Sequence, residues 1–224
     1  MAMSAALVAA LTACGGGGGD TAGPDPVNGG RQNGDSLEGH EDTAPAVLTG
    51  TQLQTVLSGN AGIPEAWGGR SPEAAKEGAE AVERCGADAG TGCAGLTAMA
   101  LRVLENQTLE QFKADVDGQT MFVNVYSFDS AENAAVTAKA LSATERKDAK
   151  DARPLKITTG AEDTDAFSEK LAEDEYSANA VLRAGTVVIT LWGTDLKGTG
   201  DMQPIAKRMV DRVLKVAAGK NPDA

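Results

Sequence analysis

One segment in the middle of the chain has a strand-turn-strand-helix order, and this order constrains the fold more than any other feature. Residues 109–116 and 119–128 have the composition of two strands, with Asp117-Gly118 as the turn between them. Apolar side chains alternate along the second strand, as they do when the two faces of a sheet differ. Ser130 then provides an N-cap for a helix. The segment predicts a hairpin with a helix packed on it.

The same order recurs near the end of the chain. Residues 178–183 and 186–192 read as strands about an Ala184-Gly185 turn, and a helix is expected over 202–217. Its apolar stripe consists of Ile205, Met209, Val210, Val213 and Leu214. Two such units predict an α+β fold, in which helices pack on a central antiparallel sheet to form an α/β sandwich.

The remaining elements are less sharply marked. Apolar spacing favours a short amphipathic helix at 51–57, and a loop with Trp67 at its tip follows. Residues 72–105 have a mostly helical composition, with a break around 86–92. We expect a strand at 155–159, and a loop or an exposed helix over the acidic residues 162–175.

The start of the chain is typical of an exported protein. Residues 3–13 form an uncharged apolar run, too short to span a membrane, that ends in Leu-Thr-Ala before Cys14. This ending resembles a bacterial lipobox, which implies a signal peptide over 1–13 and a lipid-modified Cys14 as the mature N-terminus. The usual Lys or Arg before the run is missing. We therefore expect a protein anchored through its lipid to the outer face of the cell membrane.

The segment after Cys14 has the composition of a stalk. Residues 14–46 comprise the lipidated cysteine, five consecutive glycines and a tract rich in Pro, Gly and acidic residues, which cannot bury enough apolar surface to fold. Residues 47–224 are expected to form the extracellular globular domain. The only histidine of the chain, His40, falls in the stalk, where solvent exposure is expected rather than a role as a metal ligand.

The two remaining cysteines, Cys85 and Cys93, lie on either side of the break in the helical region. In an exported protein such a pair most simply forms a disulfide, since no nearby histidine or Cys-x-x-Cys spacing favours a metal or redox site.

Charge and motifs limit the function. A net charge of −12 argues against a nucleic-acid partner. We find no nucleophile elbow, phosphate loop, metalloprotease motif or cofactor motif, and Glu162-Asp-Thr-Asp165 matches a calcium loop poorly. We therefore expect that the protein is not an enzyme and that it binds neither a cofactor nor a metal. The many Asp and Glu residues nevertheless leave open a pair of carboxylates for hydrolysis.

Aromatic residues are scarce, and four of them are candidates for a ligand cleft because loops and strand ends frame such sites: Trp67, Tyr126, Phe128 and Trp192. The alternative is that they fill the core of a protein that has few aromatic side chains.

The order of elements resembles the extracellular sensor domain of mycobacterial receptor-type serine/threonine kinases, a domain that also occurs in free actinobacterial lipoproteins. The likeness covers residues 47–218 and rests on Leu53–Leu57, the loop to Trp67, the run Val123–Ala135 and the hairpin at Arg183–Gly185. The kinase domains have a second disulfide, whereas this chain offers one pair of cysteines beyond Cys14. The sequence contains no kinase, so signalling in cis is not expected.

The resemblance implies a sandwich with a cleft for an unknown ligand. Our first hypothesis is a non-enzymatic binding or sensor module that captures a ligand or a protein partner in the cell envelope. An accessory or scaffold subunit of a membrane complex is the alternative, and an envelope hydrolase with a carboxylate pair comes third.

Overall fold

The structure is a computed structural model that describes residues 46–89, 93–106, 119–173, 176–194, 196 and 199–224. The predicted stalk up to residue 45, including Cys14 and His40, and the expected strand at 109–116 lie outside these ranges. The described elements are α1 (Gly50–Leu57), β1 (Trp67–Gly69), β2 (Lys76–Glu77), α2 (Gly78–Ala89), β3 (Leu96–Asn106), β4 (Thr120–Phe128), α3 (Ala131–Asp148), β5 (Arg153–Pro154), β6 (Asp163–Lys170), β7 (Tyr176–Ala184), β8 (Val187–Thr194) and α4 (Thr199–Ala217).

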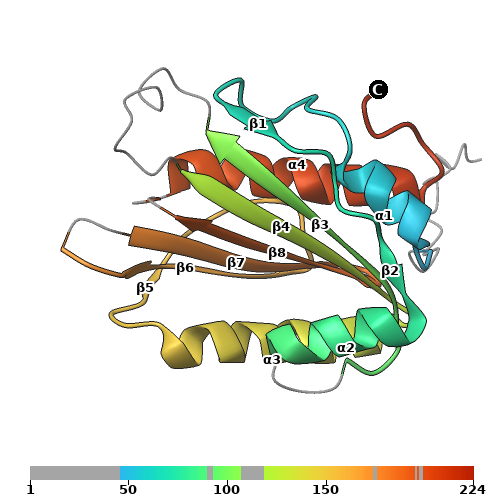
Figure 1. Ribbon diagram of the computed structural model, residues 1–224, viewed down its shortest axis with the longest axis horizontal. Helices are drawn as coiled ribbons and strands as arrows, with labels where there is room; N and C mark the ends of the chain where they lie inside the picture. The colour runs from blue at the N-terminus through green and yellow to red at the C-terminus, as the bar shows by residue number, and fades with distance from the viewer. Residues whose placement is uncertain (1–45, 90–92, 107–118, 174–175, 195, 197–198) are drawn as a thin grey trace, which may run out of the picture. The chain divides into compact units, whose positions relative to one another are not determined.

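A central antiparallel sheet organises the folded unit. Its strands follow the order β1-β3-β4-β8-β7-β6-β5, and the short β2 also pairs with β3. Helices α1 and α4 cover one face, and α2 and α3 cover the other (Figure 1). The predicted α+β fold with helices packed on an antiparallel sheet is therefore confirmed.

Alternation along β4 separates the two faces of the sheet. Met121, Val123 and Val125 belong to the larger core, which they share with α1 and α4. Tyr126 and Phe128 belong to a smaller core beneath α2 and α3. The alternation of apolar side chains that the sequence predicts for this strand is therefore confirmed.

The hairpin β7–β8 and helix α4 also form as predicted. Gly185 lies in the turn with φ of 60°, a conformation that a glycine adopts at little cost. The apolar stripe of α4 is buried in the larger core, apart from Leu214, which is exposed. Helix α3 begins after Ser130, whose side chain accepts a hydrogen bond from the backbone N–H of Asn133.

Helix α1 depends on contacts from distant parts of the chain. Its N-terminus has a capping box formed by Thr49 and Gln52. At its C-terminus, Arg102 from β3 donates to the carbonyls of Leu57 and Gly59, each at 2.7 Å. Arg212 from α4 donates to the carbonyls of Val56 at 2.5 Å, Thr55 at 2.8 Å and Ser58. Two buried guanidinium groups therefore bind carbonyls that the helix itself leaves unpaired.

The expected helical region over 72–105 is confirmed only in part. Among its described residues, Gly78–Ala89 form helix α2, whereas Lys76–Glu77 form strand β2 and Leu96–Asn106 form strand β3, which pairs with β4 along nearly its whole length. Alanine, leucine and methionine favour a helix, but β3 lies between β1 and β4 in the sheet, and this tertiary setting overrides the local preference.

The expected elements after α3 are also corrected. Residues 155–159 form no strand, whereas the acidic segment contains strand β6, paired with β7 from Asp163 to Lys170. Phe167 is buried, and the carboxylates of Asp163 and Asp165 bind arginine side chains, Arg183 and Arg146 respectively. These ion pairs neutralise the carboxylates, so an acidic segment can form a strand at this side of the sheet.

None of the helices among the described residues is long and apolar enough to cross a membrane.

Candidate functional site

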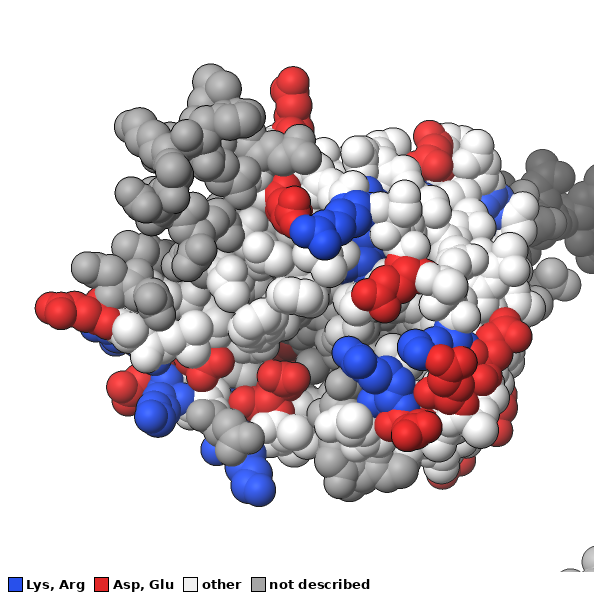
Figure 2. Space-filling view, in the orientation of Figure 1, with Lys and Arg blue, Asp and Glu red and all other residues white. Residues whose placement is uncertain are grey.

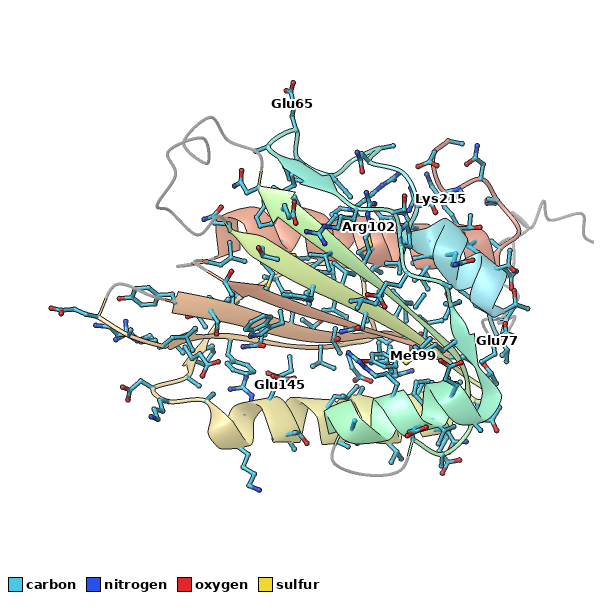
Figure 3. All side chains as sticks on the ribbon, viewed as in Figure 1. Glu65, Glu77, Met99, Arg102, Glu145 and Lys215 are labelled. Carbon is cyan, nitrogen blue, oxygen red and sulfur yellow. A yellow bond between two sulfur atoms is a disulfide. The ribbon has the colours of Figure 1, made fainter. Side chains whose placement is uncertain are left out.

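A hollow of about 390 Å³ lies between the sheet and the helices α2 and α3. Strands β4, β8 and β7 provide its floor, and both helices contribute side chains to its roof. Figure 2 shows this side of the molecule, which is hollowed between the sheet and the helix layer, and Figure 3 shows Glu145 on the side of α3 that faces the sheet. The volume falls within the range of about 300–1,000 Å³ that small-molecule sites occupy. We call this hollow the cleft.

Strand register places the floor side chains in rows. Phe122 on β4 lies opposite Trp192 on β8, which lies opposite Asn179 on β7. Residues directly opposite one another in an antiparallel pair project to the same face, so these three side chains are neighbours. The rings of Phe122 and Trp192 lie 5.3 Å apart at an angle of 39°, and Trp192 is 37% exposed. An indole supported on Phe122 thus stands at the open part of the cleft.

Asn179 is the unusual member of this row. It is only 2% exposed and lines the cleft, and no hydrogen bond joins its side chain to the part of the chain that the structure describes. Its amide atoms are nevertheless not among the fully buried side-chain atoms without a partner, which are Trp67 Nε1 and Arg208 Nε in the described residues. The amide of Asn179 therefore keeps contact with the open space of the cleft, where water or a ligand can pair with it.

The second row of the floor is polar as well, but it is satisfied internally. Asn124 on β4 lies opposite Thr190 on β8, and its Nδ2 donates to the Thr190 hydroxyl at 3.2 Å. Tyr126 and Leu141 are buried and close the inner end of the cleft. The floor therefore combines aromatic rings with uncharged hydrogen-bonding groups.

The roof carries one charge of each sign. Arg84 from α2 and Glu145 from α3 are both exposed and line the cleft. Among the described lining residues Glu145 is the single carboxylate, so the cleft lacks the pair of carboxylates that glycoside hydrolysis requires.

Helix α3 is fixed against the sheet by a charged cluster beside the cleft. Arg146 pairs with Asp165 on β6, where its Nε donates at 2.7 Å, and its guanidinium also lies 4.4 Å from the ring centre of Phe167. The hydrogen bond from Arg146 lowers the pKa of Asp165, against the opposing effect of burial, and a hydrogen bond from Ser142 lowers it further. The cluster holds the wall of the cleft in place.

A second hollow, of about 420 Å³, lies on the other side of α3. Its carboxylates, Asp163 and Asp165, are already paired with arginines. No group of three or more metal-binding side chains was found among the described residues. The cleft is therefore the better candidate for a ligand site.

The four aromatic candidates from the sequence fall in different places. Tyr126 and Trp192 line the cleft. Phe128 is fully buried in the core beneath α2 and α3 and does not line it. Trp67 begins β1 and is buried in the larger core with α1 and α4, on the opposite face of the sheet, so it cannot contribute to the cleft. For Trp67 and Phe128 the alternative of a core role is the correct one.

Sequence reasoning missed the polar half of the site. Asn124, Asn179 and Thr190 all interrupt apolar strands at positions that face the helices α2 and α3. An uncharged polar residue at an inward strand position is a signal that could have drawn attention to them. The roof residues Arg84 and Glu145 carried no such signal, because both lie on solvent-exposed helices.

The disulfide is present between Cys85, in the second half of α2, and Cys93, just before β3, as predicted. Both cysteines are buried among the residues of the smaller core. The bond ties α2, and with it Arg84, to the sheet.

The comparisons with known proteins bear on the fold. No family model and no curated protein sequence matches the chain. Among solved structures, the crystal structure of the extracellular domain of PknH from Mycobacterium tuberculosis is similar, with a TM-score of 0.51 and 14% sequence identity over 75% of this chain and 98% of that one. The similarity shows a common fold. The resemblance to the kinase sensor domains is thus confirmed at the level of fold.

Proposed function

We propose that this protein is a non-enzymatic binding module of the cell envelope that captures a ligand in the cleft between the sheet and the helices α2 and α3. The observation that carries the proposal is the pair Trp192 and Asn179 on the floor of the cleft, where a partly exposed indole lies beside an amide that has no hydrogen-bonding partner among the described residues. The likeness to an extracellular domain supports a location outside the cytoplasm. The lipobox-like sequence before Cys14 supports attachment to the outer face of the membrane.

An accessory or scaffold subunit, the alternative function, would need a flat apolar surface for its partner. The large apolar side chains that are exposed among the described residues come from different elements: Val47, Val82, Val136, Leu171, Trp192 and Leu214. The structure therefore gives more support to ligand capture than to a scaffold.

The chain contains its own probe for ligand binding. It has two tryptophans, Trp192 in the cleft and Trp67 in the core on the opposite face. A ¹H–¹⁵N spectrum of the oxidised domain should show one indole signal for each. We would titrate the protein with four sets of small compounds: neutral sugars, nucleosides, short peptides and fatty acids. Ligand capture predicts that at least one set shifts the Trp192 signal and leaves the Trp67 signal in place. If no set moves the Trp192 signal, the proposal is wrong.

The proposal also predicts an unusual stability effect. We expect Asn179→Leu to raise the free energy of unfolding by up to about 1 kcal/mol, because leucine has a similar size, adds apolar contact on the sheet and leaves no described partner without a hydrogen bond. The increase in the free energy of unfolding should be accompanied by a loss of ligand binding, because residues that form a binding site often lower stability. Urea unfolding of the oxidised protein measures the change.

Asn124→Leu is the matched control, since Asn124 lies on the same floor but has a partner in Thr190. This variant should lose stability or leave it unchanged, because the Thr190 hydroxyl loses its hydrogen bond. Destabilisation by Asn179→Leu would instead mean that this amide has a structural role, and the main argument for a ligand site would fall.

A further inference from the structure

We infer that the ligand of the cleft is a neutral sugar chain, which stacks on Trp192 and binds the amide of Asn179. The inference rests on the proposed function and adds the chemical class of the ligand. Four features of the cleft lead to it: the aromatic pair, the uncharged polar floor, the balance of charge and the shape.

The aromatic pair offers a surface for a sugar ring. Trp192 is 37% exposed although it packs against Phe122, so part of the indole remains open to the cleft. The face of an aromatic ring is electron-rich and attracts groups with partial positive charge. A pyranose ring presents a face of C–H groups with this character, while its hydroxyls point outward from the rim. Stacking on Trp192 would therefore bring the hydroxyls toward the groups beside it.

The neighbours of Trp192 suit hydroxyls. Asn179 is the cross-strand partner of Trp192, and Asn124 and Thr190 form the next row of the floor. An amide offers both donors and an acceptor, and a sugar hydroxyl both donates and accepts. A fatty acyl chain would cover these groups without pairing them, which is costly. The floor thus favours a polyhydroxylated ligand over a lipid tail.

The charges favour a neutral ligand. Arg84 and Glu145 give the described lining of the cleft one cation and one anion, in a protein with a net charge of −12. An anionic ligand, such as a nucleotide or a phosphorylated headgroup, would meet repulsion from this surface.

The position of the cleft on the sheet disfavours an extended peptide. Its floor includes β4 and β8, which are paired with strands on both sides. Their backbone groups are thus engaged, and a peptide could not bind by adding a strand, which requires a free edge. Recognition must come from side chains, as expected for a sugar.

The shape allows a ligand longer than one sugar ring. A smaller hollow beside β2 and β3 shares Arg84 and Leu101 with the cleft, but its volume of about 20 Å³ has room for a water molecule and not for a sugar ring. The sugar units must therefore lie in the cleft itself, with its volume of about 390 Å³, and a longer chain can continue into solvent at the exposed Trp192.

The test uses neutral hexasaccharides of glucose, N-acetylglucosamine and mannose, with oligogalacturonate as an anionic counterpart of similar size. We expect at least one neutral hexasaccharide to shift the Trp192 indole signal, and to bind more tightly than both its own monosaccharide and oligogalacturonate. Trp192→Ala should weaken this binding at least about tenfold through the loss of stacking, and Trp192→Phe should weaken it less. Asn179→Leu should also weaken it at least about tenfold, because the sugar hydroxyl loses its partner.

Val136→Ser is the control, since Val136 is exposed on α3 and does not line the cleft. The affinity of the Val136→Ser variant for the sugar should equal that of the wild type. The result that overturns the inference alone is a shift of the Trp192 signal by a fatty acid, a peptide or a nucleoside but by no sugar; the cleft would then be a binding site for another class. A Trp192 signal that responds to no class overturns the proposed function as well.

Discussion

Arg212→Met should lower the free energy of unfolding by about 3–5 kcal/mol, because it removes a buried cation whose hydrogen bonds have no substitute. The side chain is only 1% exposed and donates to the carbonyls of Thr55, Val56 and Ser58 at the end of α1, and to the carboxylate of Asp223. Methionine fills a similar volume but donates nothing, so several carbonyls would be left unpaired. Urea unfolding of the oxidised protein measures the loss.

The neighbouring Arg102 cannot take over this role. Its guanidinium is already bound to the carbonyls of Leu57, Gly59 and Arg70 and to the side chain of Asn60. Burial lowers the pKa of Arg102, and the proximity of Arg212 lowers it further. Two cations at one helix end are nevertheless favourable for α1, because the C-terminal carbonyls carry the negative end of its dipole.

Lys207→Met is the matched control on the same helix. Lys207 is largely exposed and pairs with Asp211 four residues later at 3.0 Å, so its removal should cost no more than about 0.5 kcal/mol. If Arg212→Met also costs less than about 1 kcal/mol, the carbonyls at the end of α1 have found other partners, and the role given to Arg212 is wrong. Faster amide exchange in α1 than in α3 would show that the damage is local to the helix end.

The parts of the fold that the sequence predicted well are those encoded by local signals. Strand β4 has a clear alternation of apolar residues, α3 has Ser130 as its N-cap, and β7 and β8 are joined at Gly185. Each signal lies within a few residues of the element that it specifies, so no knowledge of distant neighbours was needed.

The misread parts depend on distant residues. Strand β3 has a helical composition and is a strand only because β4 pairs with it. Strand β6 is acidic and is stable within the sheet because Arg146 and Arg183, from two other elements, neutralise its carboxylates. Neither pairing can be read from the spacing of residues along the chain.

The site divides in the same way. Trp192 and Tyr126 could be proposed because aromatic residues are scarce and one of them ends a strand. Trp67 fits the same description in the sequence, and only the register of β1 against β3 places it in the opposite core. The importance of Asn179 depends on the absence of a partner in the described structure, which no local pattern can reveal.

Outside the cleft, the buried Arg212 did carry a signal in the sequence, since it interrupts the apolar stripe of α4 that includes Met209 and Val213.

The second large effect concerns the disulfide between Cys85 and Cys93. We expect the double variant Cys85→Ala/Cys93→Ala to lower the free energy of unfolding by about 2–4 kcal/mol, since closing a short loop restricts the unfolded chain and the sulfur atoms also fill part of the core. Cys85 is fully buried and Cys93 is 2% exposed, in the cluster that includes Tyr126 and Leu141. Urea unfolding compares the variant with the oxidised wild type.

Loss of the disulfide should also loosen the roof of the cleft, because the bond joins the second half of α2 to the residues before β3 and α2 carries Arg84. Amide exchange should therefore accelerate more in α2 than in α3, which the Arg146–Asp165 pair still holds on β6. Glu83→Ala provides the control, since Glu83 is exposed on α2 and should change the free energy of unfolding by less than about 0.5 kcal/mol. Equal acceleration in both helices would show that the disulfide stabilises the domain as a whole and does not specifically hold α2. An unchanged free energy of unfolding would show that packing alone keeps the roof in place.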